Sequence, residues 1–399
     1  MNAKRKVGQV GNLPEEGQVA NLPYFWAEAR RSPSGRCPVN TVRVDLGLRS
    51  YDIAVVSDNM AGLGAFARAR CPGGLALIVH DVHVAGHARS AADALANSGF
   101  RVERTELPAG EPQKALAVAA QLYDVLAGLH ADRRTLVVAL GGGVMGDLAG
   151  FVAATYNRGL PLLMVPTTLL AMVDSSVGGK VGVNHPRGKN LIGAFHQPVG
   201  VWIDTATLAT LPDREYRSGL AEVVKYGVIL DGDFFAWLEE KVDALNRRGA
   251  EAVRHIVARC CQLKAEVVAR DEREETGLRA VLNYGHTFAH AFETVGGYGA
   301  WLHGEAVAAG MVCASRLAER RGLIPAAITA RQLRLLHAFG LPIAPRAWPV
   351  AELVETMRSD KKAVAGRLRF VLPRRLGEVA LFADVPEADL IAVLESAKT

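Results

Sequence analysis

Residues 135–147 read Thr135-Leu-Val-Val-Ala-Leu-Gly-Gly-Gly-Val-Met-Gly-Asp147, a short apolar run followed at once by a glycine-rich turn and then by a helix-like pattern. Gly141, Gly143 and Gly146 match G-x-G-x-x-G, in which glycine allows a tight turn and lets a pyrophosphate approach the N–H groups at the start of a helix. The acidic residue that usually binds the ribose about 20 residues later is missing, since Pro166-Thr-Thr168 occupies that neighbourhood. We therefore expect a variant of the dinucleotide-binding fold, although glycine clusters can also do no more than form a turn.

Short apolar runs alternate with helix-length segments from about Val42 to Leu211. The strand candidates are Ala76–His80, Arg101–Leu107, Thr135–Leu140, Leu162–Val165 and Gly200–Asp204. Between them, Gln113–His130 and Asp147–Arg158 have the spacing of amphipathic helices. This alternation predicts a parallel sheet with helices on its faces.

The pattern changes after Pro212, where apolar residues recur with a period of about 3.6. The helix candidates are Glu215–Tyr226, Phe234–Asn246, Ala250–Ala269, Thr287–Thr294, Gly304–Arg321 and Ala327–Phe339, with one late strand candidate at Arg367–Leu372. The first 40 residues contain a near-duplicate, Gly8–Pro14 and Gly17–Pro23, without sustained periodicity. We predict an α/β protein with a flexible extension at 1–40, a Rossmann-like parallel-sheet domain at 41–211 and a mainly α-helical domain at 212–399.

Composition excludes several classes of function for this chain of 399 residues, which has a net charge of +5 and a pI near 9.0. Its basic residues are spread along the chain without interleaved aromatics, so a small anionic substrate is expected and a nucleic acid is not. No apolar run reaches the roughly 18 residues of a spanning helix, and none follows the basic N-terminus, so neither a membrane segment nor export is expected. Five cysteines without a CxxC pair suit reduced thiols in the cytoplasm.

Two neighbouring stretches combine small residues with cations: Asp174-Ser-Ser-Val-Gly-Gly-Lys180 and Asn184-His-Pro-Arg-Gly-Lys-Asn190. Glycine and serine expose backbone donors, while Lys180 and Lys189 supply positive charge. A solvated surface loop is the alternative interpretation. Because both stretches follow soon after the glycine-rich turn, we predict an anion-binding loop.

Candidate metal ligands occur in the helical half. Leu282-Asn-Tyr-Gly-His-Thr-Phe-Ala-His290 places His286 and His290 four residues apart, on one face if a helix covers both. His303 follows, and Glu222 lies among apolar neighbours in another helical segment. Two histidines and one carboxylate with an open position form a catalytic zinc set. The spacing does not decide which histidine of the pair binds metal, and a buried histidine or glutamate is more often a satisfied core residue.

Taken together, these segments resemble the 3-dehydroquinate synthase family of sugar-phosphate cyclases. The resemblance runs from Arg49-Ser-Tyr-Asp-Ile53 to Gly366-Arg-Leu-Arg-Phe-Val-Leu-Pro373. Its most specific stretches are Gly141–Gly146, Pro166–Leu170, Val173–Lys180, Gly188–Phe195, Leu211–Glu215, Ser218–Gly227, Asn283–His290 and His303–Glu305.

The resemblance implies a zinc or cobalt site formed by Glu222, His286 and His303, with His290 left as an acid/base or phosphate contact. It also implies that the first domain binds NAD through Asp81, Glu111, Lys114, Gly142, Gly143, Val144, Asp147, Thr167, Thr168, Asp174, Lys180, Lys189, Thr207, Leu208, Ala209 and Thr210. His83 stands where the family has Asn, two residues after Asp81, so only the ribose contact departs from the pattern.

The same resemblance implies a substrate site in the metal-binding domain. Its residues would be Asp174, Lys180, Asn190, Lys225, Lys264, Arg279, Asn283, His290, Lys361 and Lys362, although which of the two last lysines faces the substrate is open. Arg158 resembles the arginine that reaches the phosphate bound by a neighbouring subunit. A homodimer is therefore implied.

The implied substrate is 3-deoxy-arabino-heptulosonate 7-phosphate, an anionic sugar phosphate with a carboxylate. The implied reaction is a transient oxidation by NAD, elimination of phosphate, return of the hydride and intramolecular aldol closure to 3-dehydroquinate. Zinc would act as a Lewis acid. The leaving phosphate could itself remove the proton, so a dedicated general base is not required.

Rival cyclases make 2-epi-5-epi-valiolone, 2-deoxy-scyllo-inosose or amino-dehydroquinate. The first two use substrates without the carboxylate, so the cations at Lys264, Arg279 and 361–362 favour dehydroquinate, whereas the amino analogue stays open. An alcohol dehydrogenase like glycerol dehydrogenase would not need a phosphate site. A binding protein that has lost its metal is disfavoured because all three ligand positions are filled.

Overall fold

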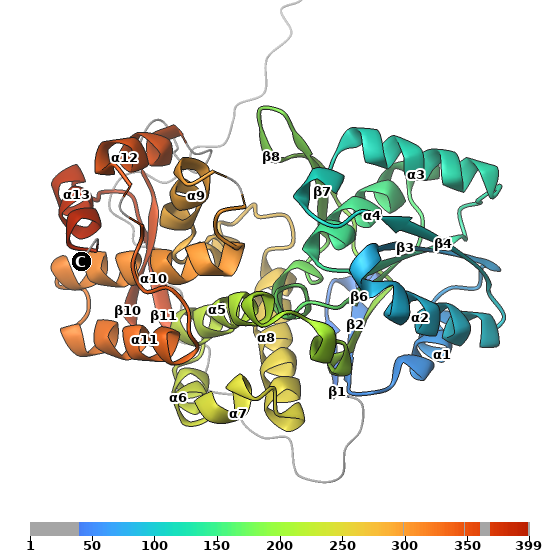
Figure 1. Cartoon of the computed structure of the whole chain (residues 1–399), viewed down its shortest axis with the longest axis horizontal. Coiled ribbons are helices and arrows are strands. Elements are labelled where there is room, and N and C mark those ends of the chain that lie inside the picture. The colour runs from blue at the N-terminus through green and yellow to red at the C-terminus, as the bar shows by residue number, and fades with distance from the viewer. Residues whose placement is uncertain (1–39, 298, 347, 360–367, 398–399) are drawn as a thin grey trace, which may run out of the picture. The chain divides into compact units, whose positions relative to one another are not determined.

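The structure, a computed structural model, describes residues 40–297, 299–346, 348–359 and 368–397. The predicted extension therefore lies outside the described residues apart from Asn40, and so do Lys361 and Lys362. In the described part, an α/β sheet region is followed by a mainly helical region, as predicted (Figure 1).

Seven strands form one sheet in the order β1-β2-β9-β6-β5-β3-β4. Their bounds are β1 (Asn40–Val44), β2 (Tyr51–Val56), β3 (Leu75–Asp81), β4 (Arg101–Leu107), β5 (Leu136–Gly141), β6 (Leu162–Pro166) and β9 (Gly200–Asp204). Only β1 is antiparallel to its neighbour, and the other pairs are parallel. The five predicted strands are confirmed, whereas β1 and β2 were not predicted.

Helices cover both faces of this sheet. They are α1 (Leu63–Arg68), α2 (Ala85–Asn97), α3 (Leu116–Gly128) and α4 (Gly143–Thr155). Along β3, Ala76 and Ile78 pack in one core with α1 and α2, while Leu77 and Val79 face the other core, which contains α3 and α4. Because successive side chains point to opposite faces and both faces are buried, the central strands β3, β5 and β6 are nearly continuous apolar runs, whereas the edge strand β4 is charged and largely exposed.

The strand order reverses between β3 and β5: the chain adds β4 beyond β3 at one edge, and adds β6 and then β9 beyond β5 on the other side. Ligands of doubly wound sheets bind at the carboxyl ends of the strands that flank such a point. These ends are Asp81 on β3 and Gly141 on β5. Gly141 has a φ of 149°, and a Cβ there would lie 2.8 Å from Met145 Cγ and 3.4 Å from Asp81 Oδ2. The glycine-rich turn therefore stands at the switch point, with α4 beginning at Gly143.

The small-residue stretches at 174–190 are irregular only at 176–179 and at the turn 186–187, so the expected loop conformation was wrong for most of them, whereas anion binding stays a prediction. A π-helical turn (Ala171–Ser175) leads into an antiparallel hairpin of β7 (Lys180–His185) and β8 (Gly188–Phe195). Glycine is needed here for close packing: a Cβ on Gly182 would lie 2.7 Å from Ile192 O, and one on Gly193 would lie 2.4 Å from Val181 O. The glycine content thus reflects tight strand pairing rather than loop structure.

The second half of the chain is mainly helical. Its helices are α5 (Asp213–Ile229), α6 (Gly232–Glu240), α7 (Val242–Asn246), α8 (Ala250–Arg270), α9 (His286–Val295), α10 (His303–Arg320), α11 (Ala326–Ala338), α12 (Val350–Ser359) and α13 (Glu387–Ser396). A hairpin of β10 (Phe370–Arg375) and β11 (Glu378–Phe382) accompanies them. The six predicted helices are confirmed, except that the segment Phe234–Asn246 is divided into α6 and α7. The late strand begins at Phe370, and α12, α13 and β11 were not predicted.

Helix α10 is central to the helical half, where it packs against α5, α9 and α11. Gly304 lets it approach α5, because a Cβ at this position would lie 1.9 Å from Ser218 O. Gly310 does the same toward α9, since its Cβ would lie 2.3 Å from Gly285 O. These close crossings bring the N-terminal ends of α9 and α10 to the middle of α5.

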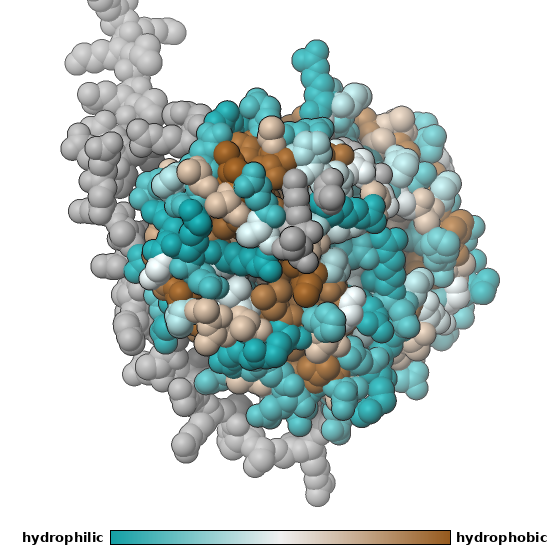
Figure 2. Space-filling model, turned by 60° about the vertical axis from the view of Figure 1, so that its left-hand side comes forward, coloured by the Kyte–Doolittle hydropathy of each residue, from teal (hydrophilic) through white to brown (hydrophobic). Residues whose placement is uncertain are grey.

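Helices α5 and α8 lie between the sheet and α9–α13 (Figure 1). α8 packs on β1 and β2, and the described residues from Asn40 onward group into one compact unit. The division at 211/212 therefore stays a prediction. The face shown in Figure 2 is mostly hydrophilic with separate apolar patches. No described helix has the length and apolar character needed to cross a membrane.

Candidate active site

Three side chains from three helices converge on one point. Glu222 comes from the middle of α5, His286 is the first residue of α9 and His303 is the first residue of α10. Their ligand atoms all lie within 4.8 Å of one another. Glu222 Oε1 is 3.7 Å from His286 Nε2 and 3.9 Å from His303 Nε2. The spacing is suited to a metal ion held between two imidazole nitrogens and one carboxylate oxygen.

The outer nitrogen of each imidazole contacts an acceptor. His286 Nδ1 lies 3.1 Å from the carbonyl of Tyr284, and His303 Nδ1 lies 3.4 Å from Glu293 Oε1. Donation from Nδ1 puts the lone pair of the ring on Nε2, the nitrogen on the inner side, as metal-binding histidines require. Glu222 Oε1 is fully buried and receives no hydrogen bond from the described residues. An orphaned buried carboxylate oxygen between two imidazole nitrogens fits a divalent cation.

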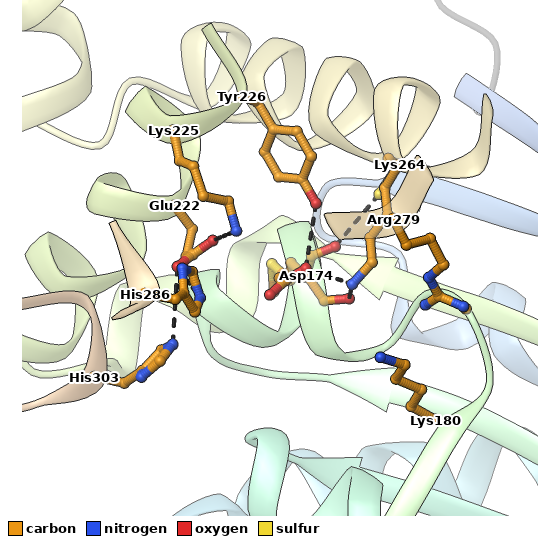
Figure 3. A network of polar contacts seen from close by, with 12 residues as sticks. Asp174, Lys180, Glu222, Lys225, Tyr226, Lys264, Arg279, His286 and His303 are labelled. Carbon is orange, nitrogen blue, oxygen red and sulfur yellow. Dashed lines mark hydrogen bonds and ion pairs between the residues drawn. The ribbon is translucent and has the colours of Figure 1, made fainter. Parts of the chain in front are cut away.

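Lys225 lies one turn after Glu222 on α5 and forms an ion pair with its Oε2. Both side chains are buried, with exposed fractions of 1% and 0%. Burial alone would lower the pKa of Lys225, but the carboxylates of Glu222 and Asp174 raise it above its ordinary value. A charged ammonium therefore stands beside the candidate metal site (Figure 3).

A cavity of about 590 Å³ opens beside these residues. Among the predicted site residues, its lining includes Asp147, Asp174, Lys180, Asn190, Lys225, Lys264, Arg279, Asn283 and His286. Figure 3 shows the metal set on one side of this network, and Asp174 with the remaining cations on the other. The whole lining contains four cations, Lys180, Lys225, Lys264 and Arg279, against three carboxylates, Asp147, Asp174 and Glu274, and this net positive charge favours an anionic ligand. A second hollow of about 650 Å³ around Trp237 and His255 contains none of the predicted residues.

Asp174, in the π-helical turn, is the centre of a buried polar network. Lys264 on α8 donates to its carboxylate, and also to its main-chain oxygen at 2.6 Å. Tyr226 OH donates to Asp174 Oδ1 at 3.2 Å. Burial would raise the pKa of Asp174, but Lys264 and Lys225 lower it well below its ordinary value. Asp174 is therefore an ionised acceptor that holds Lys264 at the cavity wall.

A carboxylate that the sequence did not reveal faces two of the predicted cations. Glu274 pairs with Lys180, and its Oε1 lies 3.7 Å from Arg279 Nε. Arg279 is 3% exposed, and its Nη1 donates to the carbonyl of Glu272 at 2.7 Å. Glu274 thus brings together two cations from distant parts of the chain. Lys180 lies on β7, and Arg279 lies in the segment between α8 and α9.

On the sheet side, predicted nucleotide-binding residues pair with one another. Lys114 forms an ion pair with Asp147, and Glu111 Oε1 accepts from Asn184 Nδ2 at 2.7 Å. Burial raises the pKa of Asp147, although Lys114 opposes the shift. These contacts join the segment 111–114 to α4 on one side and to β7 of the hairpin on the other. The nucleotide assignments themselves stay predictions.

The remaining predicted residues have separate positions. Thr207, Leu208, Ala209 and Thr210 form a 3-10 segment after β9, where Thr210 Oγ1 lies 3.0 Å from His87 Nε2. Asp81 accepts from the main-chain N–H of His83 at 2.9 Å. His290 lies one turn after His286 on α9, outside the cavity lining. Arg158 is exposed and also lies outside the lining, and its role stays a prediction.

Sequence reasoning missed Tyr226, Glu274 and Glu293. Glu293 had a readable signal, because it follows His286 by seven residues and His290 by three and so lies on the same helix face. Glu274 had none, since a charged residue in an irregular segment gives no indication of where it points.

Comparison with known proteins agrees with this geometry. The family model for the 3-dehydroquinate synthase N-terminal region matches residues 104–218, and that for the 3-dehydroquinate synthase C-terminal region matches residues 219–363. The 3-dehydroquinate synthase of Desulforamulus reducens is 52% identical over 358 residues, which are 89% of this chain and 99% of that protein.

Two solved cyclases have the same fold at lower identity. A 2-deoxy-scyllo-inosose synthase in complex with carbaglucose-6-phosphate, NAD+ and Co2+ is 27% identical, with a TM-score of 0.81 over 90% of this chain and 100% of that one. A 2-epi-5-epi-valiolone synthase from Streptomyces hygroscopicus with bound NAD+ and Zn2+ is 28% identical, with a TM-score of 0.80 over 92% and 99%. Because both family models match in sequence order and the curated relative matches over nearly its whole length, the chain belongs to the 3-dehydroquinate synthase family.

Proposed function

We propose that this protein is a 3-dehydroquinate synthase, a phosphate-eliminating lyase of aromatic amino acid biosynthesis. It converts 3-deoxy-D-arabino-heptulosonate 7-phosphate to 3-dehydroquinate and phosphate. The observation that carries this conclusion is the Glu222, His286 and His303 set beside a cavity with four cations. That combination suits a substrate whose hydroxyls bind the metal and whose carboxylate and phosphate are neutralised by the cations.

The cofactors are NAD and a divalent metal, zinc or cobalt. The two solved cyclases contain NAD+ with Co2+ or Zn2+, and the orphaned Glu222 Oε1 and the two inward Nε2 atoms fit such an ion. When bound, the nicotinamide provides reversible hydride transfer and the metal provides Lewis-acid polarisation of a hydroxyl oxygen. The glycine-rich turn at 141–147 fits the pyrophosphate, because its N–H groups stand at the start of α4.

The residues of the chain orient the substrate and neutralise its charge. Lys225 places an ammonium beside the metal set, where it can donate to the substrate hydroxyl that becomes a ketone. Lys264, which pairs with Asp174, and Arg279 both line the cavity, and they would bind the carboxylate. A phosphate that leaves within the cavity can take up the proton from the neighbouring carbon, so no further base is assigned.

The carboxylate-binding cations favour dehydroquinate over the other cyclase products. The inosose and valiolone synthases are 27% and 28% identical to the chain, against 52% for the dehydroquinate synthase. The amino analogue of dehydroquinate keeps the carboxylate, so the site does not discriminate against its precursor.

We further propose a cytoplasmic homodimer with the boundary between its NAD and metal domains at 211/212. Arg158 supports the dimer, because this exposed arginine lies outside its own cavity and is available to a neighbouring phosphate. The four described cysteines are buried free thiols, which suits a reducing compartment.

The proposed reaction is tested by incubating the purified protein with the heptulosonate phosphate, zinc and NAD at a small fraction of the substrate concentration. We expect 3-dehydroquinate and phosphate in equal amounts with no accumulation of NADH. Accumulation of NADH with an alcohol substrate, or phosphate release without dehydroquinate, would overturn the proposal.

A further inference from the structure

Glu293 contacts both His303 of the metal set and the β7–β8 hairpin. It lies on α9, two turns after His286, with a side chain that is 12% exposed. Its Oε1 is 3.4 Å from His303 Nδ1 and 3.8 Å from Lys189 Nζ. The carboxylate is therefore largely, but not fully, buried between α10 and β8.

The two histidines of the metal set are held in different ways. His286 has a side chain that is 10% exposed, and its Nδ1 is fixed by the main-chain carbonyl of Tyr284. His303 begins a helix, and its side chain is 34% exposed. Glu293 is the acceptor that the described residues offer to its Nδ1. The orientation of His303 thus depends on one replaceable side chain, whereas that of His286 does not.

We infer that Glu293 is a positioning residue for His303. Its carboxylate accepts from Nδ1–H, so it fixes the tautomer that leaves the Nε2 lone pair directed toward Glu222, 3.9 Å away. A carboxylate behind a metal-bound imidazole also makes the ring a stronger donor to the metal. This inference rests on the metal site of the proposed function.

The geometry argues against two simpler roles for Glu293. It is not placed as a fourth ligand, because it lies on the Nδ1 side of His303, away from the Nε2 that faces Glu222. It is not a solvent-exposed ion pair either, since the carboxylate is largely buried. The ammonium of Lys189, on β8, partly neutralises it from the hairpin side.

The test is metal binding by metal-free protein, measured without turnover. Glu293→Leu removes the acceptor at similar size, whereas Glu293→Gln keeps an amide oxygen that can still accept. Glu239→Gln is the matched control, because it removes a carboxylate paired with Arg331 on distant helices. Zinc affinity is measured by competition with a chelator, and cobalt binding by the visible absorption of the bound ion.

We expect Glu293→Leu to lose about 10- to 100-fold in zinc affinity and to change the cobalt spectrum. Glu293→Gln should lose less, and Glu239→Gln should match the wild type. Wild-type affinity and spectrum in Glu293→Leu would overturn the inference, and Glu293→Ala, which also lacks an acceptor, decides in the same way if the Leu variant does not fold. The metal site itself is tested by His303→Ala: unchanged affinity there would refute the proposed site, independently of Glu293.

Discussion

Lys225 and Glu222 form a fully buried ion pair across one turn of α5. Glu222 is also the shared carboxylate of the metal set, so the ammonium and a bound cation would both face it. Two positive charges on one carboxylate repel each other, and this repulsion becomes stronger in a buried site of low dielectric constant. Lys225 therefore weakens metal binding, so its role at this site is not to hold the metal.

Replacing Lys225 by Met should separate these two effects. We expect kcat to fall by about 100-fold or more, because a donor organised for the transition state is lost. Zinc affinity should stay equal or increase, because a like charge is removed. Steady-state kinetics and chelator competition measure the two quantities. Lys241→Met, at an exposed position, is the control, and parallel loss of activity and zinc in Lys225→Met would show that the lysine only maintains the site.

Chelation should abolish activity, and zinc or cobalt should restore it. The reason is that Glu222, His286 and His303 form a donor set of two nitrogens and one oxygen, which suits zinc or cobalt. Activity is measured after dialysis against a chelator and after adding back each metal. Magnesium serves as a control, since it prefers oxygen ligands. Full turnover by metal-free protein would contradict the assignment.

Arg279→Ala should weaken binding of the carboxylated substrate more than that of an analogue lacking the carboxylate. A hydrogen bond to a charged group contributes about 1.5–3 kcal/mol, so roughly a 10- to 100-fold rise in KM is expected for the natural substrate. Arg331→Ala removes a different arginine ion pair and controls for general destabilisation. Equal losses for both substrates would remove the argument that this cation selects the carboxylate.

How much of the fold could be predicted depended on the length and periodicity of each segment. Strands β3, β5 and β6 were readable because both of their faces are buried, as Leu77 and Ile78 show. The hairpin β7–β8 was not, since Gly182 and Gly193 are typical of turns and their role in close pairing depends on a partner strand. A break within a helical pattern, as at Lys241, is likewise decided by packing.

The candidate site was predictable where spacing carried the signal. His286 and His290 were found from their spacing, but the choice between them required the position of α10. Glu222 lies 64 residues before His286 in the numbering, so no local pattern could join them. The metal set is assembled by the glycine-mediated crossings at Gly304 and Gly310, which are tertiary contacts.

Asp271→Asn should destabilise the protein in a pH-dependent way. The buried carboxylate accepts from the main-chain N–H groups of Thr276 and Arg279, each at 3.1 Å, and so shapes the segment that carries Arg279. Burial would raise the pKa of Asp271, but these donors lower it below 3.8, its ordinary value. A folded-state pKa below that of the unfolded chain stabilises the fold at higher pH, and this stabilisation is lost as the pH falls through the folded-state value.

The Asp271→Asn variant should therefore be less stable by about 1–3 kcal/mol at pH 7. Chemical unfolding at neutral and at acidic pH measures the difference, which must shrink toward acid, and Asp93→Asn on the surface of α2 controls for the loss of net charge. A deficit that stays constant with pH would show that the carboxylate charge does not hold this segment.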